Sequence, residues 1–191
     1  MKRLGILACV MVLFVASTSF TRADEQDLIR QMQSGNAVLM IRHALAPGIG
    51  DPESFDLNDC STQRNLNQAG REQARAIGQW LRSRGIRQAK VYSSQWCRCL
   101  ETARLMQAGT VTPLPALNSF FQRPQDREQN LATLKKFIHQ ETEPDELIVM
   151  VTHQVTISAI TGQWADSGHG KLLRPTKAGG IEVLGELSFE D

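Results

Sequence analysis

Hydrophobic residues gather in short runs that predict strands. The runs at residues 37–41 and 147–151 are unbroken, which is typical of strands buried on both faces of a sheet. Shorter runs predict strands at residues 91–93 and 181–184. Residues 111–117 include two prolines, so they predict an edge strand, where a missing backbone donor is tolerated. Together these runs predict a β-sheet.

Between the strands, apolar residues recur at helical spacing. After Asn67, a residue type that caps helices, apolar side chains fall on one face before Gly85: Ala69, Ala76, Ile77, Trp80 and Leu81. Similar patterns predict helices over residues 27–33, around 100–105, from 126 or 127 to 140, and from 154 to 160. Strands that alternate with helices predict an α/β fold, with a mostly parallel central sheet covered on both faces in one domain.

One long segment, residues 46–67, is rich in Pro, Gly, Asp, Asn and Ser and predicts a loop. Loops of this length in a compact domain are usually functional. In parallel sheets, ligands bind beyond the carboxyl ends of the strands. This rule singles out residues 42–43, 93–98 and 152–153.

The amino-terminal segment has the layout of a secretory signal peptide. Lys2 and Arg3 precede an apolar run at residues 4–15, followed by small and polar residues that end at Ala23. The run is short for a membrane span, which needs about 20 apolar residues; a retained signal anchor is the alternative. We therefore predict that residues 1–23 are removed, and that residues 24–191 form a periplasmic or secreted domain without stable membrane insertion.

Charge argues against one class of partner. The chain has 21 basic and 20 acidic residues, so it lacks the single-sign field of a dedicated nucleic-acid binder. Lys2, Arg3 and Arg22 lie in the predicted signal, so 18 basic residues remain against 20 acidic ones, a net charge of −2. Three of the four cysteines remain, and in an oxidising compartment one bridge and one free thiol is the simplest outcome.

The three strand ends carry two arginines and two histidines: Arg42, Arg98, His43 and His153. Arginine forks suit a phosphate or carboxylate, and helices that begin there aim free backbone N–H groups at the same point. An imidazole beside a bound phosphate can act as a base or as a nucleophile. Each residue alone also has a structural interpretation, but together they indicate an anion site.

Four ordered motifs resemble those of the histidine phosphatase superfamily, in its phosphoglycerate-mutase-like branch. They are Ile41-Arg42-His43-Ala44, residues 64–70 with Gln73-Ala74, residues 92–98 with Thr102-Ala103, and Val151-Thr152-His153-Gln154. The resemblance spans about residues 38–160 and implies a phosphoglycerate-mutase-like three-layer sandwich.

The resemblance also implies roles for individual residues. His43 would accept the phosphoryl group from a small phosphorylated substrate, and water would release it in a second step. Arg42, Arg98 and His153 would bind the phosphoryl oxygens. No metal and no cofactor are implied, because the arginines supply the positive charge.

The sequence departs from the family where many members carry a glutamate that protonates the leaving oxygen. Ser119 stands there, and a hydroxyl is a weak proton donor. Asp126 is the favoured replacement, although it equally suits the start of the next helix. The other candidate acids are Glu128, Asp51, Glu53, Asp56 and Asp59.

Cysteine placement is the second departure. The resemblance favours a bridge from Cys60 to Cys97, because the family usually buries a small residue at the position of Cys99. That bridge would fix the long loop over the phosphate pocket. A zinc site is the alternative, but two cysteines separated by one residue lack the usual ligand spacing.

These expectations combine into an exported phosphatase that hydrolyses a phosphomonoester through a phosphohistidine on His43. Two alternatives stay open: removal of phosphate from a lipopolysaccharide or other envelope sugar, and a non-catalytic protein of the same fold that binds phosphate or glycan. Three aromatic residues, Trp96, Phe120 and Phe121, either line the substrate pocket or belong to the core, and the core is the general expectation.

Overall fold

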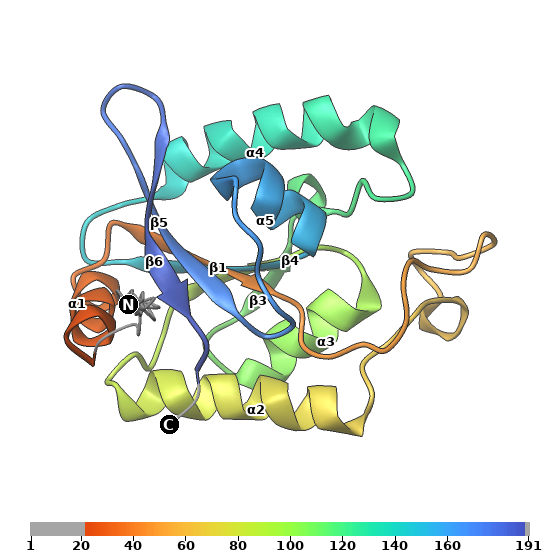
Figure 1. The fold of residues 1–191 in the computed structure, drawn as a ribbon, viewed down its shortest axis with the longest axis horizontal. Coiled ribbons are helices and arrows are strands. Elements are labelled where there is room, and N and C mark those ends of the chain that lie inside the picture. The colour runs from red at the N-terminus through yellow and green to blue at the C-terminus, as the bar shows by residue number, and fades with distance from the viewer. Residues whose placement is uncertain (1–21, 190–191) are drawn as a thin grey trace, which may run out of the picture.

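The computed structural model describes residues 22–189. Six strands form its sheet, in the order β3-β2-β4-β1-β5-β6 (Figure 1). Their bounds are Ala37–Arg42 (β1), Lys90–Ser93 (β2), Val111–Pro113 (β3), Leu147–Thr152 (β4), Gly170–Pro175 (β5) and Ile181–Leu187 (β6). Strands β1 to β4 are parallel, while β5 is antiparallel to both of its neighbours. The sheet is mostly parallel, as predicted.

The two central strands, β1 and β4, explain the unbroken apolar runs. Every residue of β4 is buried, as is every residue of β1 except Arg42. Successive side chains point to opposite faces of a strand. Leu39 and Ile41 accordingly join the core on one face of the sheet, and Val38 and Met40 join the core on the other.

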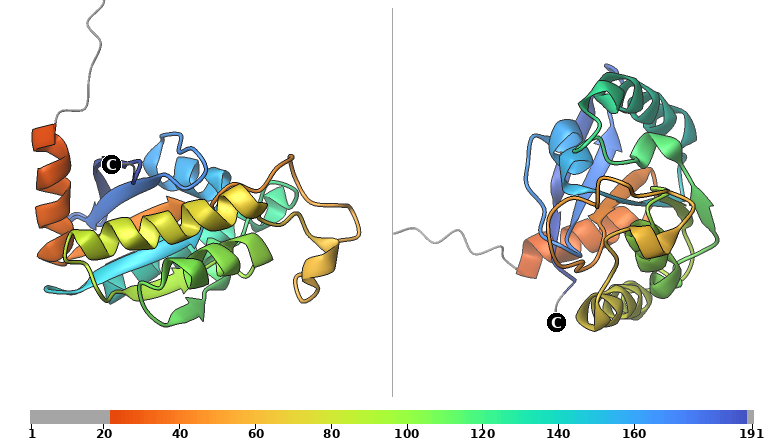
Figure 2. Two further views of the ribbon diagram at one scale, coloured as in Figure 1. Left: turned by 90° about the horizontal axis from the view of Figure 1, so that it is seen from below. Right: turned by 90° about the vertical axis from the view of Figure 1, so that its right-hand side faces the viewer.

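Helices cover both faces of the sheet, which confirms the predicted three-layer α/β sandwich (Figure 1). One face carries α1 (Arg22–Gln33), α2 (Gln68–Ser83) and α3 (Cys97–Met106). The opposite face carries α4 (Arg127–Glu141) and α5 (Gln154–Thr161). The loop that follows β1 projects beyond this body (Figure 2).

The start of α2 is built as the sequence predicts. The side chain of Asn67 accepts a hydrogen bond of 2.8 Å from the backbone N–H of Gly70. A Cβ atom at Gly70 would lie only 2.0 Å from the carbonyl oxygen of Leu45. The glycine therefore lets α2 pack directly against the chain that leaves the site at the end of β1.

Strand β5 is absent from the sequence prediction. Its pattern is weak, because its two leucines, Leu172 and Leu173, stand between Lys171 and Arg174. The ammonium group of Lys171 is buried by the strand pairing and lies 2.7 Å from Glu186 of β6. A buried charge is tolerated only when it is paired in this way.

The predicted signal, residues 1–23, lies outside the described residues except for its last two, which belong to the first turn of α1. No helix within residues 22–189 combines the length and the apolar character that crossing a membrane requires.

Candidate active site

The three predicted strand ends meet at one edge of the sheet. Strand β4 lies between β1 and β2, with Arg42 opposite Thr152 and Ser93 opposite Val151. The segments that leave these strands therefore start at the same level. They line a cavity of about 280 Å³ that includes all four predicted side chains: Arg42, His43, Arg98 and His153.

His43 is held as a neutral imidazole. Its Nδ1 lies 2.8 Å from the carbonyl oxygen of Ala44, which only accepts hydrogen bonds, so Nδ1 carries the proton and Nε2 keeps its lone pair. The side chain is 2% exposed. Burial, and then the positive charge of Arg98, lower the pKa of His43 to about 3. An uncharged ring with a free Nε2 is the form that can act as a nucleophile.

His153 is also neutral, and both of its ring nitrogens contact protein groups. Burial and the charge of Arg98 hold the pKa of His153 well below its ordinary value. Nδ1 lies 3.4 Å from Nη2 of Arg98, which can only donate, so Nε2 donates to Ser94 Oγ at 2.8 Å. The ring centroids of His43 and His153 are 5.6 Å apart. For His153 to donate a hydrogen bond to a bound phosphoryl group, its contact with Arg98 or with Ser94 must be replaced by one with a phosphoryl oxygen.

The guanidinium groups of Arg42 and Arg98 each retain an unused donor. Within the described chain, Nε of both arginines is buried and has no hydrogen-bond partner. Buried donors are normally satisfied, and exceptions require an explanation. An anion seated between the two arginines would supply the missing acceptors, which fits the predicted phosphate-binding roles.

Arg98 is fixed by Asp51, which comes from the long loop. Nη1 and Nη2 of Arg98 lie 2.8 and 3.1 Å from Oδ1 and Oδ2 of Asp51, and each side chain is 3% exposed. Burial alone would raise the pKa of Asp51, but the hydrogen bonds and charge of Arg98 outweigh it and lower that pKa below its usual range. Asp51 is therefore ionised and orients Arg98.

Arg64 is a third arginine in the cavity, and the sequence interpretation assigned it no role. It is half-buried and lines the cavity, with its side chain donating to the carbonyl oxygens of Ala46 and of Gly50, the latter at 2.8 Å. Its charge contributes to the lowered pKa of both His43 and His153. A basic residue at the start of a recognised motif was the signal that could have identified it.

Asp126 does not lie where a general acid must be. It immediately precedes α4, its side chain is paired with Arg123 at 3.3 Å, and it is not among the residues that line the cavity. It also makes no side-chain cap hydrogen bond. Among the candidate carboxylates, Asp51 lines the cavity, and Ser119 lines it as well.

A disulfide joins Cys60 to Cys97, with a Cα–Cα distance of 5.7 Å. It ties the long loop to the first residue of α3, directly before Arg98. Cys99 is a free, buried thiol, and burial raises its pKa to about 12. Cys99 therefore stays protonated and is not a nucleophile, although Sγ lies 3.5 Å from Nε2 of His153.

The aromatic residues divide between core and cavity. Trp96 and Phe120 are buried, as the general expectation has it, and Nε1 of Trp96 donates to Asp51 at 3.0 Å. Phe121 instead is exposed at the mouth of the cavity. Core packing was therefore the wrong expectation for Phe121.

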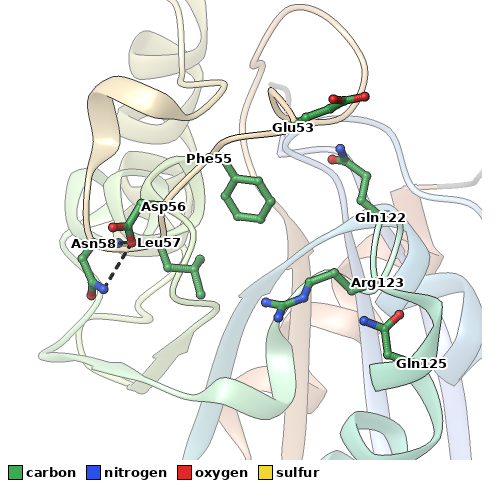
Figure 3. A pocket seen from close by; sticks show the side chains of 8 residues that line it. All are labelled: Glu53, Phe55, Asp56, Leu57, Asn58, Gln122, Arg123 and Gln125. Carbon is green, nitrogen blue, oxygen red and sulfur yellow. Dashed lines mark hydrogen bonds between the residues drawn. The ribbon is translucent and has the colours of Figure 1, made fainter.

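A second, more polar cleft of about 820 Å³ adjoins the first at Gln122, and Figure 3 shows the side chains that line it. Its walls are the long loop and the segment before α4, with these lining residues: Glu53, Phe55, Asp56, Leu57, Asn58, Gln122, Arg123 and Gln125. Gln122 lines both spaces. Its amide accepts from the backbone N–H of Asp51 at 2.7 Å and donates to the carbonyl of Asp51 at 2.9 Å, so Gln122 is fixed against the long loop where the two spaces adjoin.

Comparisons with known proteins agree with this geometry. Residues 38–120 match the histidine phosphatase superfamily (branch 1). Among curated proteins, no sequence matches the chain. Several solved structures share its fold at low sequence identity. The protein histidine phosphatase SixA complexed with tungstate is 14% identical, with a TM-score of 0.58 over 80% of this chain and 97% of that one.

Two further structures are similar to the same extent. The alpha-ribazole phosphatase from Shigella flexneri is 16% identical, with a TM-score of 0.56 over 77% of this chain and 94% of that one. A phosphoserine phosphatase from Entamoeba histolytica is 12% identical, with a TM-score of 0.57 over 81% and 98%. The matched residues 38–120 hold Arg42, His43 and Arg98 of the cavity, and their similarity to the histidine phosphatase superfamily, branch 1, supports a phosphatase.

Proposed function

We propose that the protein hydrolyses a phosphomonoester of a small molecule through a phosphohistidine on Nε2 of His43. The observation that carries the proposal is the hydrogen bond from Nδ1 to the Ala44 carbonyl. It leaves the lone pair of Nε2 free inside a cavity that three arginines line: Arg42, Arg64 and Arg98.

The reaction proceeds in two displacements. Nε2 of His43 attacks phosphorus, a P–N bond forms, and the P–O ester bond breaks as the leaving oxygen takes a proton from water. Water then attacks the phosphohistidine, the P–N bond breaks, and inorganic phosphate leaves. The arginines offset the charge on the phosphoryl oxygens in both steps, which is where phosphoryl transfer needs most help.

Because the glutamate is missing, water is the proton donor to the leaving oxygen in this mechanism. Asp51 is the carboxylate that lines the cavity, and its ion pair with Arg98 keeps it ionised, so it has no proton to give. The similar structures are a protein histidine phosphatase, an alpha-ribazole phosphatase and a phosphoserine phosphatase, and the substrates in these names have three different leaving groups. Their likeness supports the chemistry at phosphorus and leaves the rest of the substrate open.

Trapping the intermediate tests this proposal. Purified protein is mixed briefly with a labelled aryl phosphate and quenched in base, where phosphohistidine is expected to persist while acyl phosphates decay. We expect label on the wild type and on His139→Asn, whose altered histidine lies on α4, and none on His43→Asn. Turnover by His43→Asn would overturn the mechanism. Binding of phosphate without label or turnover at any pH would indicate the non-catalytic alternative.

We also propose that the protein is exported, with residues 1–23 removed, and acts in the periplasm or outside the cell. Support comes from the amino-terminal pattern and from the Cys60–Cys97 disulfide, because disulfides persist in oxidising compartments. Substrates attached to envelope sugars are compatible with this location. Sequencing the protein recovered from outside the cytoplasm should give Asp24 as the first residue, and a chain that still begins at Met1 would contradict the proposal.

A further inference from the structure

Large hydrophobic side chains are exposed at the mouth of the cavity. Four such residues are exposed in the described part of the chain, and three of them line the cavity: Ile49 at 91%, Trp164 at 63% and Phe121 at 57%. The fourth, Leu45, does not line it. We call Ile49, Phe121 and Trp164 the apolar collar. Single exposed hydrophobic residues need no explanation, but a group around a cavity indicates a binding surface.

Three separate segments supply the collar. Ile49 comes from the loop after β1, Phe121 from the segment before α4, and Trp164 from the connection between α5 and β5. Two members have local contacts that hold them in place. Nε1 of Trp164 donates to Asp166 at 3.0 Å, and the backbone N–H of Phe121 donates to Ser119 Oγ at 3.3 Å.

The collar stands directly above the cationic floor of the same cavity. The guanidinium carbon of Arg42 lies 5.6 Å from the centre of the Trp164 ring, so one collar residue touches a phosphate-binding arginine. A ligand that fills this space has an anionic head at the arginines and an apolar body at the mouth. The space of about 280 Å³ holds a phosphate and only the first part of the group attached to it.

The neighbouring cleft suits an apolar group poorly, because most of the side chains that line it are polar or charged: Glu53, Asp56, Asn58, Gln122, Arg123 and Gln125. The leaving group therefore extends past the collar. Three side chains cover much less area than the 20 to 30 residues of a typical protein interface, so the collar suits a hydrocarbon chain better than a protein partner.

We propose that the substrate is an amphiphile, a phosphomonoester whose leaving group is a hydrocarbon chain that packs against Ile49, Phe121 and Trp164. This proposal rests on the proposed phosphatase activity and specifies the substrate class of the same site.

A series of n-alkyl phosphates from ethyl to octyl, used below the concentrations at which they aggregate, tests it. The phosphate and the leaving oxygen stay nearly constant along the series, so only contact with the chain changes. We expect kcat/KM to rise with length, by up to about fourfold for each buried methylene. In Ile49→Ser and Phe121→Ser the octyl-to-ethyl ratio should fall by about tenfold, whereas Leu45→Ser should keep the wild-type ratio.

Binding of the corresponding alkyl phosphonates, which cannot be hydrolysed, separates this proposal from the proposed function. Affinity that rises with chain length and depends on the collar supports the amphiphile even if no phosphate ester turns over. Hydrolysis or binding that is independent of chain length overturns it and leaves the phosphatase intact. A phosphorylated peptide turned over faster than octyl phosphate at equal concentration would also overturn it, in favour of a protein substrate.

Discussion

The floor and the mouth of the cavity are made by different kinds of structure. The floor consists of Arg42, His43, Arg98 and His153, which lie at the ends of inner strands or in the first turn of the helix that follows, and all but Arg42 are almost fully buried. The mouth consists of exposed side chains on loops, with Ile49 as the most exposed. On the proposed function, the sheet would fix the chemistry at phosphorus, while the loops would select the group attached to it.

Two links join these regions. The Cys60–Cys97 disulfide connects the long loop to α3, and the Asp51–Arg98 ion pair connects the same loop to the floor. The long loop, which carries Ile49 of the collar, is thereby held in register with Arg98 of the floor. Losing both links would free the loop from the floor, whereas a change at the floor that keeps the disulfide leaves the loop tied to α3.

Removing the disulfide should have the largest effect on stability. The bridge closes a segment of 37 residues, and chain entropy predicts up to about 4 kcal/mol of stabilisation for such a loop. Cys60→Ser should therefore unfold at clearly lower urea concentration than the wild type, as followed by circular dichroism. Added reductant should lower the midpoint of the wild type and of Cys99→Ala, but not that of Cys60→Ser. A reductant effect that persists in Cys60→Ser would contradict this role.

Arg98→Lys should lower kcat/KM by about 10²-fold, because lysine keeps the charge but loses the planar fork. The present fork makes two contacts to Asp51 and one to His153. The loss should be equal for ethyl and octyl phosphate, since the disulfide still ties the loop that carries Ile49 to α3 in this variant. A loss that falls on one chain length only would show that floor and mouth do not act independently.

Acid should destabilise the floor through its neutral histidines. The pKa of His43 is lowered to about 3, below the ordinary value near 6.5 that the unfolded chain has. Between these values the unfolded state binds the additional proton, so the free energy of unfolding falls as pH falls from about 6.5 toward 3. The slope is at most about 1.4 kcal/mol per pH unit for each histidine, and His153 contributes in the same direction.

Urea unfolding at pH 7, 6 and 5 measures this slope. His43→Asn should show a shallower dependence than the wild type, because asparagine does not titrate. His139→Asn, changed outside the cavity, should follow the wild type. An unchanged slope in His43→Asn would contradict the lowered pKa, because it would mean that the His43 ring takes up its proton at the same pH in the folded and unfolded states.

The floor could be predicted from the sequence because it depends on strands. Apolar runs mark β1 and β4, and residues directly after parallel strands are brought together by topology alone. The mouth could not be predicted, because loop residues are placed by long-range contacts without a local pattern. Asp51 reaches Arg98 across 47 positions of the chain, and Gln122 reaches Asp51 across 71. Phe121 could not be placed for the same reason. Its aromatic residue type suggested the core, and only the fold shows that it is exposed.

The smallest effect is expected from the carboxylate that the sequence favoured as the acid. Asp126→Asn should change kcat/KM on alkyl phosphates by less than about twofold, because its partner is Arg123 on the surface and a proton donor must reach the leaving oxygen. Asp51→Asn is the matched comparison, since it removes the same charge from the loop that faces the cavity. It should lower kcat/KM by about tenfold through the orientation of Arg98, and it should do so evenly from pH 5 to 8, because Asp51 stays ionised there. A rate that falls with rising pH in the wild type and loses this dependence in Asp126→Asn would instead return Asp126 to the reaction, and would require the segment before α4 to fold over the collar.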